Sequence, residues 1–517
     1  MSKLVQILAL LAFTAMVAVM VLEAFPNCDH IASLRFANED YNKKDVDKVE
    51  KDCKICCKNQ NAHPVRYDYA EAIILRLATN KHIGASTTDS MQADELLVAY
   101  IATTYYDITP VLGSIKPLCG YSDKNFVLTD SADLRTYVLK IVNKNESTKA
   151  LTDIIDEILD NAHEFCSETL ATLRACSFVV PKLIRTTGNK MSTFTTVKYR
   201  RDMTTHRGLD EYMSIDDGDF DGSSVELVKC NIKLSDYFDG ITMFDFINRS
   251  SLALLRIKSF AGYLREEKLD KPERLYAKIG RVCNELFVFL RTQRHLIDKL
   301  KVARGDSFPW QVKSCEPHVR KLLDRIYPSY DTTQSSLKRR TLVERALDDY
   351  LRNVKPQLDK LPEFIIHSDL CNRNILINWD GTTPAHGKLC LIDFQDLQVG
   401  HQVIELAVMM AYQVIEQEQM PFDKALKLIP QWLYAGYQSG KCPLDSAELV
   451  LVPALIKLRL CQSLLNGQLA FQEDSKNTYV MHTNQRGWQL LELMSDTNSE
   501  LGDSAKLAAF WQSGATE

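Results

Sequence analysis

The residues of this chain whose types and spacing could do chemistry lie mainly in one segment, residues 364–396. Four residues separate Asp369 from Asn374, and Asp393 follows a second apolar run. Transfer of a nucleotide's terminal phosphate needs a carboxylate beside the incoming hydroxyl, and hard oxygen ligands that hold Mg²⁺ against the phosphates. The spacing therefore predicts a phosphotransferase site, with Asp369 as catalytic base and with Asn374 and Asp393 as metal ligands. We expect His367 to shape this loop by hydrogen bonding rather than to act as a base.

A site of this kind also needs a cation for the nucleotide phosphates, and Lys140 is the candidate. Lys140 ends the strand-like run TYVLK. A lysine at a strand end is often simply exposed to solvent, but this one follows a turn between two strand-like runs. That turn could bring backbone N–H groups over the phosphates, although it holds a single glycine. Its candidate nucleotide-binding residues are Gly120, Tyr121, Ser122 and Asn125.

Lys140 would need a carboxylate to orient it, and the long helix expected at residues 148–175 should supply one. Glu164 and Glu168 lie one turn apart on one face of that helix. Glutamates on helices are usually solvated, so the residue type alone decides nothing. We favour Glu168 as the partner of the lysine.

The apolar patterns outside these motifs predict the elements that position them. Strand-like runs occur at 111–118, 124–129, 136–142, 192–199 and 224–232. Helical spacing occurs at 92–106, 148–175, 250–266, 273–300, 315–326, 338–360, 400–416, 422–438, 445–468 and 484–496. A small sheet with one long helix, followed by a larger helical half, predicts an α+β, bilobal fold with a cleft between the lobes. We place a small antiparallel-sheet lobe at residues 89–235 and a mainly helical lobe at residues 236–510.

The first 88 residues have a different character. An apolar run from Leu4 to Leu22 makes residues 1–24 look like a signal peptide or an uncleaved signal anchor, with a plain apolar extension as the alternative. Residues 25–88 form a Cys-bearing extension. Its cysteines could pair as disulfides or, on a weaker signal, hold zinc; they are Cys28, Cys53, Cys56 and Cys57. We expect contact with a membrane only through residues 1–24, if they are not cleaved.

Composition bounds the class of protein. The 517 residues are 45% apolar and 25% charged, which is typical of a globular chain and excludes a mostly disordered, collagen-like or polytopic membrane protein. The formal net charge of −5 gives no electrostatic footprint for nucleic acid, so we expect no nucleic-acid partner. The remaining ten cysteines are scattered, as in a reduced cytosolic enzyme. The N-terminus favours the secretory pathway instead, and the localisation stays open.

Several segments resemble a known superfamily. HSDLCNRNIL and LIDFQD are similar to the aminoglycoside phosphotransferase and choline kinase superfamily. GYSDKNF with TYVLKIVN, then DSFPWQV, and RLCQSLL followed by GWQLLELM narrow the resemblance to the hydroxylysine kinases. The similar stretches run in the expected order from about residue 90 to residue 500, roughly four fifths of the chain.

The resemblance implies a protein-kinase-like fold and a small-molecule kinase of lysine degradation. The implied reaction moves the γ-phosphate of GTP, with Mg²⁺, to the hydroxyl of free 5-hydroxy-L-lysine and leaves 5-phosphohydroxy-L-lysine and GDP. It implies Asp369 as base, Asn374 and Asp393 as metal ligands, Lys140 at the phosphates and Glu405 at an acidic position of the following helix. It also implies a cytoplasmic enzyme.

Two departures from the family pattern bear on activity. Ser368 stands where glycine usually lies between His and Asp, and Gln395 stands where glycine commonly follows Asp-Phe. If glycine serves an unusual backbone angle there, Ser368 would strain the loop. ATP as donor stays open. So do a related amino-alcohol kinase, acting on choline, ethanolamine or homoserine, and a membrane-targeted, nucleotide-binding pseudoenzyme.

Overall fold

The computed structural model describes most of the chain after the N-terminal extension. It covers residues 89–514 apart from 112, 119, 121–122, 144–147, 172–175, 202–209, 214–224, 254–270, 306–307, 378–387, 474 and 476. The predictions for residues 1–24 and 25–88 lie outside the described residues and stay predictions. Within the described ranges, no helix combines the length and the hydropathy needed to cross a bilayer.

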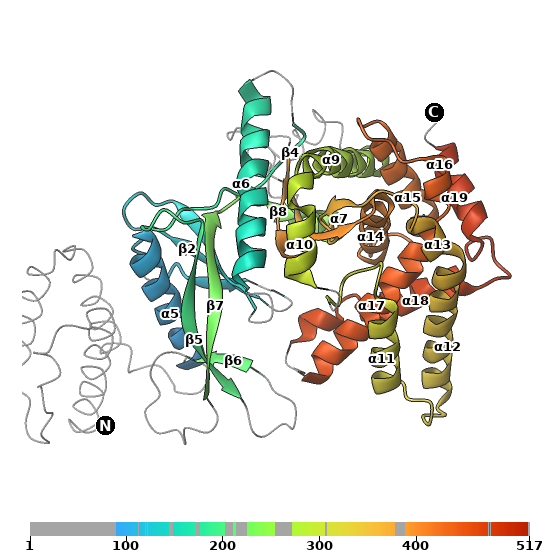
Figure 1. Cartoon of the computed structure of the whole chain (residues 1–517), viewed down its shortest axis with the longest axis horizontal. Helices are drawn as coiled ribbons and strands as arrows, with labels where there is room; N and C mark the ends of the chain where they lie inside the picture. The colour runs from blue at the N-terminus through green and yellow to red at the C-terminus, as the bar shows by residue number, and fades with distance from the viewer. Residues whose placement is uncertain are drawn as a thin grey trace, which may run out of the picture.

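The first lobe is built on a six-stranded antiparallel sheet, which lies beside a larger helical region in Figure 1. The strand order is β1-β2-β3-β7-β5-β6. The bounds are β1 Lys116–Leu118, β2 Lys124–Thr129, β3 Thr136–Ile141, β5 Ser192–Arg201, β6 Asp210–Met213 and β7 Val225–Asp236. The expected sheet is therefore present, and β6 is an addition within the acidic stretch between the fourth and fifth expected strands.

Side-chain alternation along β3 gives the sheet two different faces. Tyr137, Leu139 and Ile141 are buried and share an apolar core with helix α5 (Asp89–Tyr106). Because successive side chains of a strand point to opposite faces, Lys140 lies on the face away from α5. The sequence pattern of this one strand thus decides that the lysine faces the second lobe.

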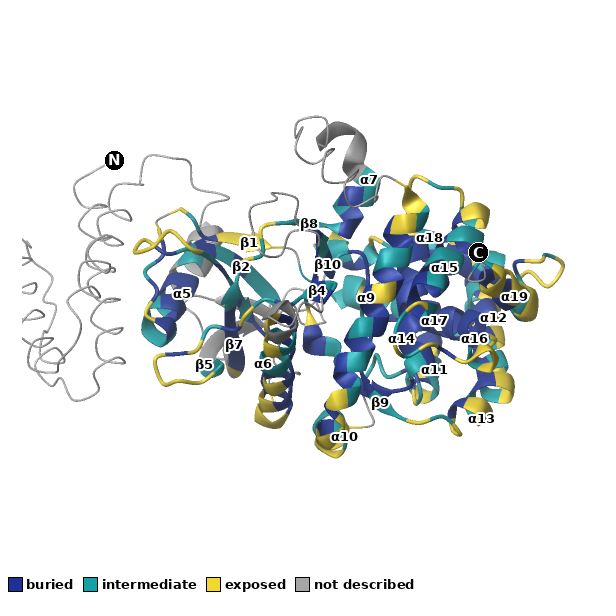
Figure 2. Cartoon of the chain, turned by 90° about the horizontal axis from the view of Figure 1, so that it is seen from above, coloured by how far each residue is buried: buried dark blue, intermediate teal, exposed yellow. Residues whose placement is uncertain are grey.

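Helix α6 (Lys149–Ala171) covers that second face and joins the lobes. In Figures 1 and 2, α5 and α6 lie on opposite sides of the sheet. Asp156 of α6 makes a 2.7 Å ion pair with Lys233 of β7, the strand neighbour of Lys140. The apolar side of α6, including Ile154 and Ile158, packs into the core of the helical lobe. The helix is therefore held by a charged contact on one side and by apolar packing on the other.

The second lobe is mainly helical. Its longer helices are α7 Met243–Ala253, α9 Pro272–Thr292, α10 Ile297–Arg304, α11 Glu316–Ile326, α12 Gln334–Asp349, α14 Gln402–Ile415, α15 Phe422–Gln438, α17 Val452–Glu473, α18 Asn484–Ser495 and α19 Ser504–Ser513. Figure 2 shows buried residues concentrated around α14 and α17, and every residue of α14 after its first is buried. These two helices form the centre of the lobe, and both contact the catalytic segment.

Short strands inside the helical lobe present that segment. β9 (Phe364–Ile366) pairs antiparallel with β12 (Gln398–Gly400). β10 (Ile375–Ile377) pairs antiparallel with β11 (Leu389–Leu391), and this sheet is completed by β8 (Ile241–Thr242) and β4 (Phe178–Val179). The loop from β9 to β10 and the loop from β11 to β12 therefore lie side by side. The first loop begins where the second ends, at the β9–β12 pair, and it ends where the second begins, at the β10–β11 pair.

Three expected helices are interrupted, and the one expected at 338–360 continues after α12 as a π-helical segment η4 (Tyr350–Val354) and as α13 (Lys355–Leu358). The helix expected at 273–300 ends at Thr292, and after the short segment η3 (Arg294–Leu296) the chain continues as α10. The helix expected at 445–468 is split into α16 (Ser446–Leu449) and α17. Asp445 caps α16, and Pro453 lies in the first turn of α17, where proline is tolerated because that N–H has no intrahelical acceptor.

Candidate active site

The loop between β9 and β10 holds Asp369 at the edge of the cleft. Nδ2 of Asn374 donates to the backbone oxygen of Asp369 at 2.9 Å and to its carboxylate Oδ2 at 2.7 Å. The backbone N–H of Ile392 donates to the Asn374 carbonyl at 3.0 Å. This contact places the loop that carries Asp393 directly beside Asn374. The three residues that the spacing singled out are thus brought together by one strand pair.

Two carboxylates of the α14 region hold the backbone of this loop. Glu405 accepts hydrogen bonds from the N–H groups of His367 and Ser368, and Glu416 accepts one from the N–H of Asn372 at 2.8 Å. Burial raises the pKa of each glutamate to about 7, although the backbone donors oppose that rise. The loop is therefore anchored at both ends to a helix that is itself in the core.

Ser368 adopts a positive φ, the unusual backbone angle that the family's glycine at this position suggested. Its φ is +68°, in the left-handed region, and the residue is fully buried. Nε2 of Gln398 donates to the Ser368 hydroxyl at 2.5 Å. The unusual conformation is thus fixed from two sides, by Glu405 at the backbone and by Gln398 at the side chain. Gln395, the second departure, is buried, and its backbone oxygen accepts from Arg304.

His367 is locked in one hydrogen-bonding role. Its Nδ1 accepts from the Asp369 N–H at 3.3 Å, and its Nε2 donates to the Ile392 carbonyl at 3.2 Å. Burial lowers its pKa to about 4, so the ring is neutral near pH 7. This arrangement agrees with the expectation that His367 shapes the loop and is not the base.

Lys140 reaches across the cleft from the first lobe to Asp393. Its Nζ lies 2.7 Å from Asp393 Oδ1 and 2.7 Å from Asp123 Oδ2. Burial opposes the charge on Lys140, but the two carboxylates outweigh it and raise the pKa of the ammonium. In the same way, burial opposes ionisation of Asp393, yet Lys140 holds the pKa of that carboxyl below its usual value. The pair is charged and links the lobes at the predicted site.

The pKa values of Asp369 and Asp396 are raised, in contrast to the lowered pKa of Asp393. Burial, followed by the nearby charge of Asp396, raises the pKa of Asp369 well above its usual value, and Arg459 opposes that rise. Burial raises the pKa of Asp396 to about 6, with Arg304 opposing. A carboxylate with a raised pKa accepts a proton more readily, as a general base beside a hydroxyl must.

The turn before β2 is only partly described. Tyr121 and Ser122 lie outside the described residues, so their predicted contacts with nucleotide stay predictions. A Cβ added at Gly120 would lie 2.6 Å from the backbone oxygen of Asp123 and 3.0 Å from Nδ2 of Asn125. Such a separation is too short for any side chain, so this close turn requires glycine.

The structure gives Lys140 two partners that the sequence did not suggest. The ion pairs of Lys140 go to Asp123, in the turn itself, and to Asp393. The α6 carboxylate that faces the sheet is Asp156, and it pairs with Lys233. Glu164 is exposed, and the side chain of Glu168 lies outside the described residues, so its assignment stays a prediction.

Sequence reasoning missed three charged residues of the site: Asp123, Asp396 and Arg459. Asp123 was visible within GYSDKNF, three residues after the glycine, and its Oδ1 also accepts from the Asn143 N–H at 2.8 Å. Asp396 stands three residues after Asp393. Arg459 begins the stretch RLCQSLL that contributed to the resemblance, but no role was inferred for it, and it interrupts the apolar helix α17 far along the chain.

The donor set suits a cation that needs few protein ligands. In the described part of the chain, no group of three or more His, Cys, Asp and Glu side chains is arranged to hold a metal ion. Asn374 and Asp393 offer one amide oxygen and one carboxylate. Mg²⁺ accepts hard oxygens and usually completes its shell with phosphate oxygens and water. These two residues therefore fit a magnesium–nucleotide.

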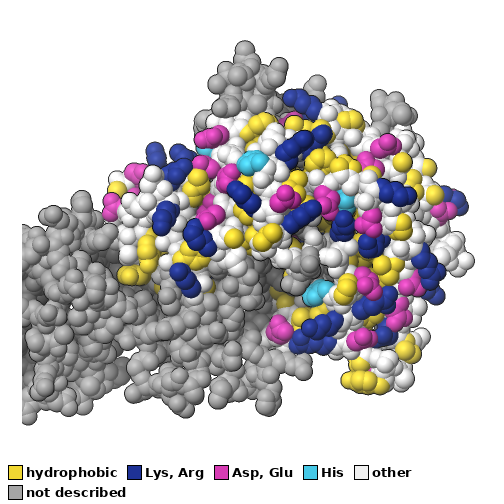
Figure 3. Space-filling view, viewed as in Figure 1, with side chains coloured by type: hydrophobic (Ala, Val, Ile, Leu, Met, Phe, Trp, Pro, Cys, Tyr) yellow, Lys and Arg dark blue, Asp and Glu magenta, His cyan; other side chains and the backbone are white. Residues whose placement is uncertain are grey.

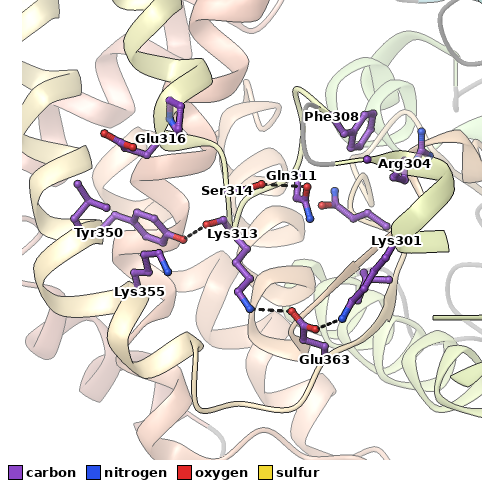
Figure 4. A pocket seen from close by; sticks show the side chains of 15 residues that line it. Lys301, Arg304, Phe308, Gln311, Lys313, Ser314, Glu316, Tyr350, Lys355 and Glu363 are labelled. Atoms are coloured by element: carbon purple, nitrogen blue, oxygen red, sulfur yellow. Dashed lines mark hydrogen bonds and ion pairs between the residues drawn. The ribbon is translucent and has the colours of Figure 1, made fainter. Parts of the chain in front are cut away.

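A separate cavity of about 580 Å³ adjoins the catalytic loop through Gln398. Figure 4 shows Lys301 and Lys313 pointing to the same carboxylate, Glu363, at 2.5 and 2.9 Å. The Tyr350 hydroxyl donates to the Lys313 carbonyl at 2.8 Å. Asp369, Asn374 and Asp393 do not line this cavity, so it is distinct from the site.

On the face drawn in Figure 3, acidic and basic side chains are interspersed.

Comparisons with known proteins show which families the chain resembles. Residues 269–439 match the model of the phosphotransferase enzyme family. The hydroxylysine kinase of Bos taurus is 27% identical over 399 residues, which span 74% of this chain and 85% of the relative. That of Xenopus laevis is 24% identical over 435 residues, or 82% and 96% of the two chains. An amicoumacin kinase structure is 13% identical with a TM-score of 0.46, covering 83% of this chain and 96% of that one.

The fold and the site define a bilobal α+β small-molecule phosphotransferase. The chain is an enzyme of this class, and it is related to the hydroxylysine kinases at 24–27% identity. The match to the phosphotransferase family includes Asp369, Asn374 and Asp393. Lys140 lies before it, within the sheet lobe.

Proposed function

We propose that this chain is a kinase that transfers the γ-phosphate of GTP to the side-chain hydroxyl of free 5-hydroxy-L-lysine. The products are 5-phosphohydroxy-L-lysine and GDP. The observation that supports the proposal most is the 2.7 Å contact between Lys140 Nζ and Asp393 Oδ1 across the lobes, beside the Asp369–Asn374 pair. The acceptor is taken from the hydroxylysine kinases of Bos taurus and Xenopus laevis, which align over most of both chains.

Each residue has a role that its surroundings support. Asp369 orients the acceptor hydroxyl and takes its proton, since its raised pKa favours proton uptake. The hydroxyl oxygen then bonds to the γ-phosphorus while the bond to the β,γ-bridging oxygen breaks and GDP leaves. Lys140 neutralises phosphate charge from the sheet lobe. Asn374 and Asp393 would hold Mg²⁺, which supplies charge neutralisation at the phosphates.

The carboxylates of the cleft suit an acceptor that carries an ammonium group near its hydroxyl. Asp396 lies close enough to Asp369 for its charge to raise the pKa of the Asp369 carboxyl. Choline, ethanolamine and homoserine kinases would have the same need, so the acceptor must be decided by measurement. ATP and GTP are likewise compared as donors, because no described contact selects the base.

The test measures nucleoside diphosphate release by the full-length purified chain with hydroxylysine, Mg²⁺ and either GTP or ATP. Asp369→Ala should lower kcat by about 100-fold or more, because it removes the base and leaves binding in place. Asp348→Ala is the matched control, because that carboxylate pairs with Arg352 on the exposed side of α12. Release that survives Asp369→Ala would refute the mechanism. A higher kcat/KM for choline, ethanolamine or homoserine would replace hydroxylysine as the acceptor.

A pseudoenzyme would give a different result in the same preparation. It would show no diphosphate release with any acceptor, whatever its affinity for nucleotide. Binding is followed separately as the rise in melting temperature with Mg²⁺ and nucleotide. A chain that binds nucleotide and releases no diphosphate would exclude the proposed kinase activity.

A further inference from the structure

Arg459 is a buried cation at the acceptor side of the catalytic carboxylate. It lies in the middle of α17, between apolar residues, and only 2% of its side chain is exposed. Its Nη2 is 3.4 Å from Oδ1 of Asp369. The other oxygen, Oδ2, already accepts from Asn374, so Oδ1 is the atom left to receive the acceptor hydroxyl. An acceptor bound at Asp369 therefore lies within reach of the Arg459 guanidinium.

Two nitrogen atoms of the Arg459 guanidinium have no hydrogen-bond acceptor among the described residues. Among the described residues, Nε and Nη1 of Arg459 have no hydrogen-bond partner and almost no exposed surface. A guanidinium stays charged in proteins, and a buried charged donor without an acceptor is costly. The 3.4 Å contact with Asp369 is long for a charge-assisted hydrogen bond. Neighbouring groups thus offset the burial of the charge, but Nε and Nη1 are left without a hydrogen-bond acceptor among the described residues.

Two other arginines near the site show what a structural arginine does in this lobe. Arg304 donates to the backbone oxygens of Gln395 and Leu397. Arg486 donates in the same way to the backbone oxygens of Ile415, the last residue of α14, and of Gln417. Both use the guanidinium to satisfy carbonyl groups that lack other partners. Arg459 makes no such backbone contact among its described hydrogen bonds, so a purely structural role does not account for it.

Aromatic rings enclose the Arg459 head group. Its Cζ lies 4.5 Å from the centre of the Trp310 ring and 5.4 Å from that of Tyr412. The ring faces stabilise a guanidinium, and the Tyr412 hydroxyl offers it a hydrogen-bond acceptor. The rings also keep water away, which strengthens any ion pair formed there.

The charges around Asp369 indicate which kind of acceptor molecule would carry an anionic group to Arg459. The carboxylates of Asp369 and Asp396 favour an acceptor with an ammonium group, whereas Arg459 repels one. An amino alcohol would meet this repulsion and would have no group that attracts the guanidinium. An amino acid brings a carboxylate as well, and Arg recognises planar carboxylates with paired donors.

We propose that Arg459 binds the α-carboxylate of the acceptor, so that this kinase phosphorylates hydroxy amino acids in preference to the amino alcohols that lack the carboxyl group. The inference rests on the proposed kinase function and names the residue that selects its acceptor class. The acceptor spans two anchors, with its hydroxyl at Asp369 and its carboxylate at Arg459.

The experiment compares pairs of acceptors that differ only in the carboxyl group. The pairs are hydroxylysine and decarboxylated hydroxylysine, homoserine and aminopropanol, and serine and ethanolamine. The wild-type full-length chain should show kcat/KM about 100-fold higher for the carboxylated member of its preferred pair. In Arg459→Met that preference should fall to within about threefold, with little change for the amino alcohol. Arg459→Lys should recover part of the preference, because it keeps the charge without the paired donors.

The control is Arg325→Met. Arg325 is an exposed residue of α11, and it pairs with Glu473 at the end of α17, the helix that carries Arg459. It should leave the preference unchanged. The inference is overturned if Arg459→Met lowers both members of a pair equally, if the wild type treats the members alike, or if no member of any pair is phosphorylated. Activity on serine or homoserine but not hydroxylysine, with the preference lost in Arg459→Met, would reject the acceptor proposed above and support the role of Arg459.

Discussion

The backbone of Ser368 offers a direct test of how the catalytic loop is held. A residue with a Cβ in the left-handed region costs about 1–2 kcal/mol, and Ser368 has φ +68° while being fully buried. We compare Ser368→Gly with Ser368→Ala. Both variants lose the hydroxyl that accepts from Gln398, at a cost of about 1 kcal/mol that cancels between them.

The two variants differ in only two terms. Glycine removes the steric cost of the positive φ, but its freer unfolded chain costs about 0.5–1 kcal/mol. The difference leaves Ser368→Gly more stable than Ser368→Ala by about 0.5–1 kcal/mol. At an ordinary helical position the order is reversed, because glycine is about 1 kcal/mol worse than alanine there.

The free energy of unfolding is measured by urea titration of the full-length variants, followed by circular dichroism. Ser336, buried within α12, provides the matched control, and Ser336→Gly should be less stable than Ser336→Ala. The same preparations are assayed for turnover, where Ser368→Gly should stay closer to the wild type because Asp369 follows directly. Greater stability of Ser368→Ala over Ser368→Gly would refute the reasoning from backbone strain.

The remaining predictions concern charge and packing. Lys140→Met should lower kcat/KM for nucleotide by about 100-fold or more, since it removes the phosphate cation, and a change below about threefold in a nucleotide titration would contradict that role. Burial raises the pKa of Glu416 from 4.5 to about 7, so the folded chain binds this proton more tightly and loses stability as pH rises between those values; Glu416→Gln should flatten that part of the curve of unfolding free energy against pH. Gly436→Ala should lower the free energy of unfolding by about 1–3 kcal/mol, because the added Cβ would overlap the Ala277 carbonyl where α15 meets α9, whereas Gly188→Ala meets only an ordinary contact; equal urea midpoints for the two variants would count against close helix packing.

Local sequence patterns predicted the elements where one physical rule dominates. The strands expected at 124–129 and 136–142 match β2 and β3 almost residue for residue, because alternating burial has a period of two on one covered face. The helices expected at 315–326 and 422–438 match α11 and α15 equally well. The break at Gln293 was missed, since no proline or glycine marks it and the apolar spacing continues through it.

The sequence by itself determined that Asp369, Asn374 and Asp393 lie beside one another, because they are close along the chain and two short strands set their spacing. It also put Lys140 on the correct face of its sheet, through the alternation of β3. Only the tertiary structure decided which charges meet. Asp123 pairs with Lys140, and Arg459 lies beside Asp369 although it belongs to a helix 90 residues further along. Ion pairs form between side chains that folding brings within a few ångströms, and no local period or motif encodes that distance.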